Sequence, residues 1–148
     1  MRISAKGRYA LAAMTFMAQQ YHNGEYITVI TISEQLGISK IYLEQVFSLL
    51  KKAELVLSFK GAQGGYQLAR TPEEITALDI LTAVEISLFE QTQDTVAEAA
   101  PEIDQALRST VFDALDRTVS ELLMGITLAD LVLEAEKYKG SQAMMFYI

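Results

Sequence analysis

The 148-residue chain contains no cysteine and a single histidine. Without cysteine it can have no disulfide, no thiolate nucleophile and no cysteine-ligated zinc or iron–sulfur site. His22 stands beside Asn23 and Gly24, a composition typical of a turn, so we assign it no catalytic role. The sequence also lacks a Ser–His–Asp arrangement and metal-ligand spacing. We therefore predict that the protein is not an enzyme and that it holds no metal or other cofactor.

Long apolar runs are also missing from the sequence. No run approaches the roughly 20 residues that a transmembrane helix needs. The first residues, MRISAKGRYALAAM, show no long apolar stretch and no clear cleavage site, which argues against a signal peptide. We expect a cytoplasmic protein, and its hydrophobic share of 51% is enough to build a core.

The net charge of −7 conceals an asymmetry between the two halves of the chain. Residues 1–70 carry eight Lys and Arg against four Asp and Glu, whereas residues 71–148 carry four against fifteen. Such asymmetry indicates a basic binding surface joined to an acidic body, and a polyanion remains a possible partner. We interpret the paired carboxylates of the second half, such as Glu73 and Glu74, as solvated acidic faces rather than a hydrolase pair.

Helix signals follow one another closely in the first half. Ser4 is expected to cap the first helix, and either Thr28 or Thr31 to cap a second helix that Gly37 ends. A third helix is expected to begin after Ser39. Two helices joined by a short glycine-containing turn are typical of a helix-turn-helix motif.

The third helix is expected to have two unlike faces. One face is apolar and should belong to the core: Leu43, Val46, Phe47 and Leu50. The opposite face is polar and basic with one isoleucine: Lys40, Ile41, Glu44, Gln45, Ser48, Lys51 and Lys52. On the first helix, a looser apolar stripe is expected at Tyr9, Ala13, Phe16, Met17 and Gln20.

The stretch LVLSFKGAQGGYQLAR predicts a β-hairpin directly after the third helix. Residues 55–59 are expected to form one strand and residues 66–69 the return strand. Lys60 begins the glycine-rich turn between them, and its glycines would let the backbone approach DNA. A hairpin in this place is the wing of a winged helix. A phosphate-binding loop is disfavoured, because no GKS/T sequence and no immediate helix follow.

A helix of this kind can enter the major groove with its first residues at base edges. Glu44 could accept from cytosine N4, Gln45 could pair with adenine, and Ile41 could touch a thymine methyl. For each of them the alternative is a side chain that simply faces solvent. Basic side chains would contact phosphates: Arg2, Lys6, Arg8, Lys51 and Lys52.

The second half is predicted to be helical around an acidic linker. A capping box at Thr76–Asp79 should open a helix that ends near Phe89. Residues 90–100 have the composition of a linker, and Pro101 suits the first turn of a long helix over about 102–124. The broad apolar stripe of that helix needs a partner, for which a second copy of the chain is the simplest candidate. Thr127 should cap a last helix that ends before Gly140.

Three linked motifs, MRISAKGRYAL, YLEQVFSLLKKAELV and FKGAQGGYQLA, resemble the Rrf-two family of bacterial transcription regulators. The resemblance covers residues 1–88 well and the rest loosely. It implies a homodimeric winged helix on palindromic double-stranded DNA, with Tyr42, Glu44 and Gln45 in the recognition helix and the wing turn in the minor groove. The fold expected is mostly α with a small β wing, a winged helix-turn-helix followed by a long C-terminal dimerisation helix.

The expected organisation has three parts. Residues 1–75 would be the DNA-binding domain, 76–139 the helical dimerisation region and 140–148 an apolar tail. The expected DNA-binding residues are Arg2, Lys6, Arg8, Ser39, Lys40, Ile41, Tyr42, Glu44, Gln45, Lys51, Lys52, Lys60, Gly61, Gly64, Gly65 and Tyr66.

Two departures from the family pattern are visible. Cluster-sensing members carry three cysteines in the segment that here reads EISLFEQTQDTVAEAAPEIDQALR and contains none. Iron–sulfur sensing through those ligands is therefore chemically excluded. The wing usually carries Arg before its first glycine, whereas this chain has Lys60, which keeps the charge but lacks the planar guanidinium fork.

The terminal sequence AMMFYI is apolar throughout. Cysteine-metabolism repressors of this family end in a similar motif and work with cysteine synthase, on which serine acetyltransferase also docks through a C-terminal isoleucine carboxylate. The resemblance therefore implies docking of cysteine synthase by Met145, Phe146, Tyr147 and Ile148. The tail could instead pack on its own dimer. Two further alternatives remain: a regulator with a different small-molecule effector, or an interaction adaptor that has lost DNA binding.

Overall fold

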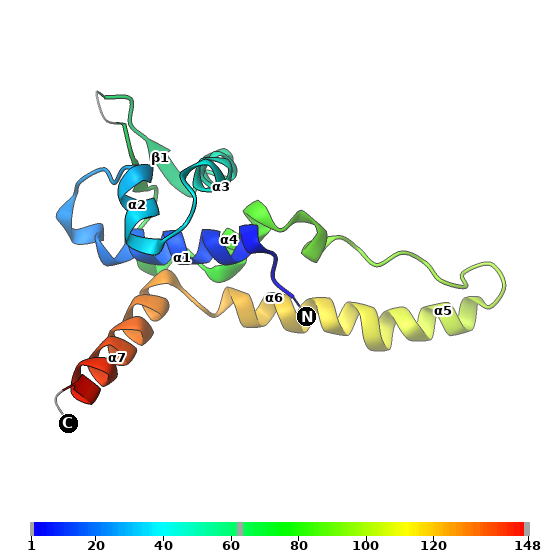
Figure 1. Ribbon diagram of the computed structural model, residues 1–148. Helices are drawn as coiled ribbons and strands as arrows, with labels where there is room; N and C mark the ends of the chain where they lie inside the picture. The colour runs from blue at the N-terminus through cyan, green and yellow to red at the C-terminus, as the bar shows by residue number, and fades with distance from the viewer. Residues whose placement is uncertain (1, 62–63, 147–148) are drawn as a thin grey trace.

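The computed structural model describes residues 2–61 and 64–146, without the side chains of 141–146. In this part of the chain the α-helices are α1 (Ala5–Gln19), α2 (Val29–Leu36), α3 (Lys40–Lys52), α4 (Ala77–Val84), α5 (Pro101–Leu107), α6 (Asp113–Met124) and α7 (Leu128–Phe146). The strands are β1 (Val56–Ser58) and β2 (Tyr66–Leu68). Short 3₁₀ turns lie at Tyr21–Asn23, Pro72–Glu74 and Ile86–Phe89, and a π turn lies at Arg108–Phe112. Figure 1 shows α1 to α4 and the hairpin gathered in one body, from which α5 and α6 project as an arm and α7 leaves in another direction.

The helix caps of the first half are those that the sequence predicts. The Ser4 hydroxyl accepts from the Gly7 N–H at 3.2 Å, and the Ser39 hydroxyl accepts from the Tyr42 N–H at 3.4 Å. Of the two candidates for α2, Thr28 is the cap, accepting from the Thr31 N–H at 3.1 Å. The chain then needs a left-handed residue to leave α2, and Gly37 supplies it with φ 67°.

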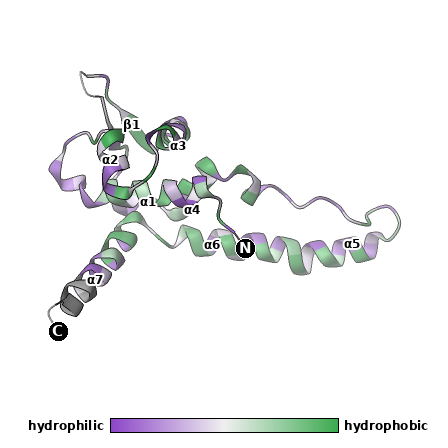
Figure 2. Ribbon diagram, in the orientation of Figure 1, coloured by the Kyte–Doolittle hydropathy of each residue, from purple (hydrophilic) through white to green (hydrophobic). Residues whose placement is uncertain are grey.

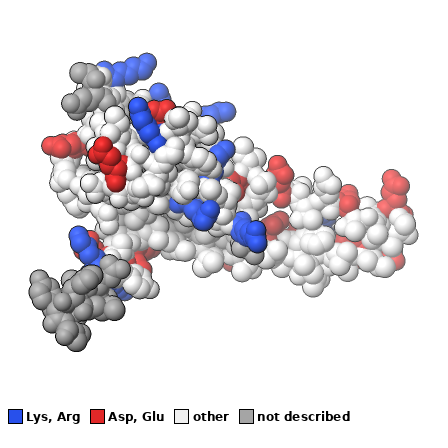
Figure 3. Space-filling model, in the orientation of Figure 1, with Lys and Arg blue, Asp and Glu red and all other residues white. Residues whose placement is uncertain are grey.

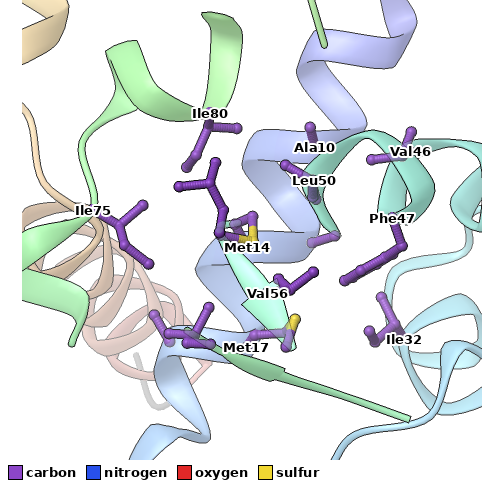
Figure 4. Close-up of a cluster of buried hydrophobic side chains, with 14 of the residues drawn as sticks. Ala10, Met14, Met17, Ile32, Val46, Phe47, Leu50, Val56, Ile75 and Ile80 are labelled. Atoms are coloured by element: carbon purple, nitrogen blue, oxygen red, sulfur yellow. The ribbon is translucent and has the colours of Figure 1, made fainter. Parts of the chain in front are cut away.

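One apolar core holds the body together (Figure 4). The predicted inward face of α3 is confirmed, since its four apolar side chains are fully buried: Leu43, Val46, Phe47 and Leu50. Figure 4 shows Phe47 beside Ile32 of α2, with Met14 and Met17 of α1 in the middle of the cluster. Each such large side chain contributes about 1.5–3 kcal/mol by leaving water.

The buried stripe of α1 differs in part from the predicted one. Ala13 and Met17 are buried as expected, but Tyr9, Phe16 and Gln20 remain partly exposed. Because α1 packs against α3, α4 and α7 together, its buried face is wide and consists mostly of small residues. The buried residues are Gly7, Ala10, Ala13, Met14, Met17 and Ala18. Aromatic side chains therefore lie at the edges of this face rather than along its centre.

The wing is an antiparallel pair in which Val56 lies opposite Leu68 and Ser58 opposite Tyr66. Both strands are shorter than predicted, with three residues each. Ile27 pairs with the hairpin as an isolated β-bridge, because its N–H and C=O exchange hydrogen bonds with Tyr66, both at 2.8 Å. The hairpin is thereby joined to the loop that precedes α2.

The helix that was predicted to reach Phe89 ends early. Its capping box is present, with the Thr76 N–H donating to Asp79 at 3.0 Å and the Asp79 N–H to Thr76 at 3.1 Å. The α-helix stops at Val84, and Glu85 leaves it with φ −111° and ψ 67°. Glu85 turns its carboxylate toward the start of α1, a long-range contact that local sequence patterns do not reveal.

The long helix after Pro101 is confirmed as one helical run to Met124, with the π turn between α5 and α6. The preceding segment, interpreted as a linker, lies along this arm (Figure 1). The Asp104 carboxylate accepts from the Thr95 N–H at 2.8 Å and the Val96 N–H at 2.9 Å. Arg108 donates to the Thr92 carbonyl at 3.2 Å, so the segment is fastened by side chains of the helix.

The last helix runs further than predicted. Thr127 caps α7 as expected, accepting from the Asp130 N–H at 3.1 Å, but the helix passes Gly140 and continues to Phe146. Met145 and Phe146 thus lie in helical backbone, while Tyr147 and Ile148 lie outside the described residues. Within residues 2–61 and 64–146, no helix combines the length and apolarity needed to cross a bilayer.

The Asp104 contacts give a testable prediction for the arm. The Val96 and Thr95 N–H groups lower the pKa of the Asp104 carboxyl from its ordinary value of 3.8. Its contribution to stability is thus fully present above that ordinary value and disappears as the pH falls through the lower folded pKa. Asp104→Asn should speed amide exchange at residues 95 and 96, measured by hydrogen exchange, with α1 to α4 unaffected.

Asp113→Asn is the matched control, because Asp113 is exposed on the same arm. Exchange at 95 and 96 should stay at the wild-type rate in this variant. Wild-type exchange in Asp104→Asn as well would show that the carboxylate does not fasten the segment.

Candidate nucleic-acid interface

The outward face of α3 carries the side chains that the sequence assigned to it. Ile41 is 70% exposed, and Gln45, Ser48, Lys51 and Lys52 are also exposed. The apolar face beneath is completely buried, so this helix has one free side, which is polar and basic. A helix of this kind offers hydrogen-bonding groups to whatever lies against it.

Glu44 and Lys40 form an ion pair on this free side, with Nζ and Oε1 3.7 Å apart and both side chains 54% exposed. An exposed pair of this type contributes only about 0–1 kcal/mol to stability. The Glu44 carboxylate can therefore exchange Lys40 for another donor at little cost, and Lys40 is then available to an anion.

Two aromatic contacts fix α3 relative to its neighbours. Tyr42 meets Tyr9 of α1 edge to face, with ring centroids 5.0 Å apart. Phe47 packs against Tyr66 of β2 at 4.6 Å. Tyr42 and Tyr66 are predicted to contact DNA, and in the structure each ring packs against another ring and against the core cluster. Their packing sets the relative positions of α1, α3 and the wing, and a DNA contact by either residue stays a prediction.

The basic side chains lie over the same body. Arg2 and Arg8 are exposed at the start of α1, Lys6 is partly exposed, and Lys60 is exposed at the wing. Figure 3 shows Lys and Arg side chains over the wing, α3 and the start of α1, with Asp and Glu side chains both on the body and along the arm. The charge asymmetry of the sequence is thus also an asymmetry in space. The basic first half forms α1 to α3 and the wing, whereas the acidic second half forms α4, the arm and α7.

A buried carboxylate holds the start of α1, a contact that the sequence analysis did not predict. Glu85 is only 7% exposed, and its Oε1 accepts from the Ser4 N–H at 2.8 Å and from the Ser4 hydroxyl. Gly7 lies directly above, where an added Cβ would be 2.4 Å from Oε1. A glycine inside a helix was the one available signal, since it often marks a close approach. This contact joins the end of α4 to the helix that carries Arg8.

The wing turn requires its glycines for conformational reasons. Gly64 and Gly65 have φ values of 67° and 136°, which side-chain-bearing residues rarely adopt. Gly61 is exposed, and Lys60 beside it is the cationic residue of the turn. The expected interface residues therefore fall into three groups on one body: the start of α1, the free side of α3 and the wing turn.

Comparisons with known proteins agree with this geometry. The family described as "Rrf2: Iron-dependent Transcriptional regulator" matches residues 3–134. The "HTH-type transcriptional regulator IscR" of Sodalis glossinidius is 40% identical over 136 residues, covering 92% of this chain and 81% of that protein. The protein of the same name from Serratia proteamaculans is 40% identical over 132 residues, covering 89% of this chain and 79% of that protein.

Two solved structures are similar along nearly the whole chain. "The Structure of CymR (YrzC) the Global Cysteine Regulator of B. subtilis" has a TM-score of 0.74 and 32% identity, covering 90% of this chain and 98% of that one. "T. potens IscR" has a TM-score of 0.72 and 35% identity, covering 93% and 90%. The predicted mostly helical fold with a small β wing is thereby confirmed. The named relatives are regulators, which also supports the prediction that the chain is not an enzyme.

The family description mentions iron, and the residues of this chain do not fit a cysteine-ligated iron group. The chain has no cysteine, and its one histidine is exposed in the turn after α1. Across the described residues, no three His, Asp or Glu side chains gather as a metal site would require. We derive no step of the mechanism through iron.

The Glu85 contact gives a prediction for stability. Glu85→Ala would leave the Ser4 N–H and hydroxyl without their acceptor and should cost about 1–3 kcal/mol in the free energy of unfolding, measured with urea. Gly7→Ala should also destabilise, because its methyl group would collide with the carboxylate. The double variant should lose less than the sum of the two, because removing the carboxylate relieves that collision.

Glu90→Ala provides the comparison, since Glu90 is an exposed glutamate in the same region. It should unfold like the wild type. Strictly additive losses for Gly7→Ala and Glu85→Ala would mean that the two residues do not share a contact.

Proposed function

The chain belongs to the Rrf2 family of transcriptional regulators, and we propose that it is a dimeric repressor that binds palindromic double-stranded DNA. The observation that carries this proposal is the free side of α3, polar and basic above a fully buried apolar face. Such a regulator would act in the cytoplasm, where bacterial DNA lies.

In the proposed complex, the start of α3 lies in the major groove. Ile41, Glu44 and Gln45 face base edges, where Glu44 accepts from cytosine and Gln45 pairs with adenine. Ser39 and Lys40 lie at the same end of the helix. The basic residues bind phosphates, which fixes the register of the protein without reading sequence: Arg2, Lys6, Arg8, Lys51 and Lys52. The wing turn, which contains Lys60, Gly61, Gly64 and Gly65, contacts the minor groove.

The arm supplies the dimer interface in this proposal. Five large apolar side chains on α5, the π turn and α6 are 49–64% exposed: Ile103, Val111, Leu115, Leu122 and Met124. Figure 2 shows the hydrophobic residues recurring along this arm. A second copy that covers them would relate two α3 helices by a two-fold axis, and palindromic half-sites about 34 Å apart match that symmetry.

Binding to duplex DNA tests the proposal. Binding measured by fluorescence anisotropy should weaken steeply with salt, by about 10³–10⁵-fold between 50 and 200 mM if 6–10 phosphates are contacted. Glu44→Ala should change sequence preference, because it removes a base-reading group. Lys52→Ala should weaken all duplexes by a similar factor, because it removes a phosphate contact.

Lys139→Ala is the matched control, since Lys139 is an exposed lysine on α7, away from α3. Salt-independent behaviour or no binding by the wild-type protein would favour the adaptor alternative. An equal loss on selected and random duplexes for Glu44→Ala would remove its base-reading role.

A finer part of the proposal concerns what the regulator controls. We propose that it represses genes of cysteine and sulfur metabolism with cysteine synthase docked on the C-terminal tail, through Met145, Phe146, Tyr147 and Ile148. Support comes from the similarity to a structure described as a global cysteine regulator and from the lack of cysteine, which excludes a cysteine-ligated cluster. Met145 and Phe146 extend α7 at the point where docking is proposed. Cysteine synthase binding would strengthen DNA binding, and accumulated O-acetylserine would displace the docked segment.

Calorimetry with purified cysteine synthase tests this part. The full-length protein should bind, a variant lacking Ile148 should not, and saturating O-acetylserine should compete with the full-length protein. Tyr138→Ala, which changes an exposed aromatic residue on α7 outside the docking segment, should bind like the wild type. No binding by either form would instead favour packing of the segment on its own dimer, and undiminished binding without Ile148 would contradict a role for its carboxylate.

One cavity favours the alternative of a small-molecule effector. A space of about 260 Å³ lies between the 3₁₀ turn after α4 and α6, lined by Leu88, Phe89, Leu115, Asp116, Val119 and Ser120. Metabolites that bind there would change DNA affinity without cysteine synthase. Titration of candidate metabolites into the protein–DNA complex separates this alternative from the docking proposal.

A further inference from the structure

Tyr26 and Phe59 stack on the outer side of the wing. Their ring centroids are 4.6 Å apart with an interplanar angle of 25°. Tyr26 lies in the loop before α2, and Phe59 follows the last residue of β1. Although they stack, Tyr26 remains 39% and Phe59 49% exposed. The pair is therefore outside the core cluster, so burial in the core does not explain why the two rings stack.

The wing turn closes directly onto this pair. The Phe59 N–H donates to the Gly65 carbonyl at 2.8 Å, at the base of the turn. A Cβ on Gly61 would be 2.6 Å from Phe59 Cε1, and a Cβ on Gly65 would be 3.1 Å from Tyr26 Cβ. Each end of the turn thus rests on one of the two aromatic residues, and at Gly65 the φ of 136° also favours glycine.

The loop on which Tyr26 lies is itself fixed to the body. Ile27 exchanges two backbone hydrogen bonds with Tyr66, and the Gln67 side chain donates to the Gly24 carbonyl at 3.1 Å. Tyr66 in turn packs against Phe47 of α3. A continuous set of contacts therefore leads from the recognition helix, through β2 and the loop, to the wing turn.

Hairpins need such support. Two isolated strands are marginally stable in water, and these strands have three residues each. A stacked aromatic pair stabilises the structure that carries it beyond the effect of the area that it buries. Lys60 follows Phe59 in the chain, so any change in the position of Phe59 also moves the cationic residue of the turn.

We propose that Tyr26 and Phe59 are positioning residues for DNA binding: their stack holds the wing turn where Lys60 meets the duplex. The inference rests on the proposed DNA-binding function. It requires no direct contact between either ring and DNA, because the rings act through the turn that they support.

A double-mutant cycle tests the inference, with affinity measured for a duplex that the wild-type protein selects from a random pool. In the wild-type background, Lys60→Ala should weaken binding and reduce the salt slope by about 0.9, the share of one phosphate contact. In the Phe59→Ala background, the same change should have almost no further effect, because the turn is already misplaced. Phe59→Tyr keeps the ring and should restore both the affinity and the effect of Lys60→Ala.

Leu57→Ala is the matched control, since Leu57 is 51% exposed on the same hairpin and is not part of the stack. It should leave both the affinity and the Lys60 effect unchanged. Tyr26→Ala removes the other ring of the pair. It replaces Phe59→Ala in the cycle if a thermal melt shows that Phe59→Ala does not fold. An equal loss for Lys60→Ala in all backgrounds would overturn the inference, whereas no wild-type binding at all would instead overturn the proposed function.

Discussion

Burial of one apolar stripe of α3 against α1 is the constraint on which the rest of the structure depends. Phe47 and Leu50 have no exposed surface, so rotation of α3 would expose several large side chains at about 1.5–3 kcal/mol each. The polar side of the helix is consequently fixed in direction, and with it Glu44 and Gln45. The apolar residues thereby determine the orientation of the predicted recognition surface without belonging to it.

Around this core, a few long-range contacts hold the peripheral parts. Glu85 fastens the start of α1 to the end of α4, and Thr76 pairs with Thr127 where α6 passes into α7. Asp104 fastens the segment before the arm. These contacts use carboxylate oxygens and backbone groups rather than apolar surface. The contacts of Glu85 and Asp104 can therefore each be removed by a single substitution outside the apolar core, whereas the bridge at Thr76 and Thr127 is made by backbone groups.

Caps and helix faces could be predicted from the sequence because they depend on near neighbours. Gly37 and Thr76 act within one turn of their own positions, and so they behave as local chemistry dictates. The early end of α4 could not be predicted, because the Glu85 carboxylate accepts a hydrogen bond from Ser4, which is 81 residues away in the sequence. The stack of Tyr26 on Phe59 was hidden for the same reason. The candidate surface on α3 was predictable, while the contacts that position it became visible only in three dimensions.

The excess of Lys and Arg in the first half, which forms α1 to α3 and the wing, and the excess of Asp and Glu along the arm give the molecule an electric dipole (Figure 3). In the field of a polyanion, a dipole experiences a torque before any contact forms. The body is turned toward the duplex and the arm away from it. A larger fraction of encounters therefore begins in the binding orientation, which raises the association rate. Since ions screen this field over about 8 Å at physiological ionic strength, the orienting effect is confined to the last approach.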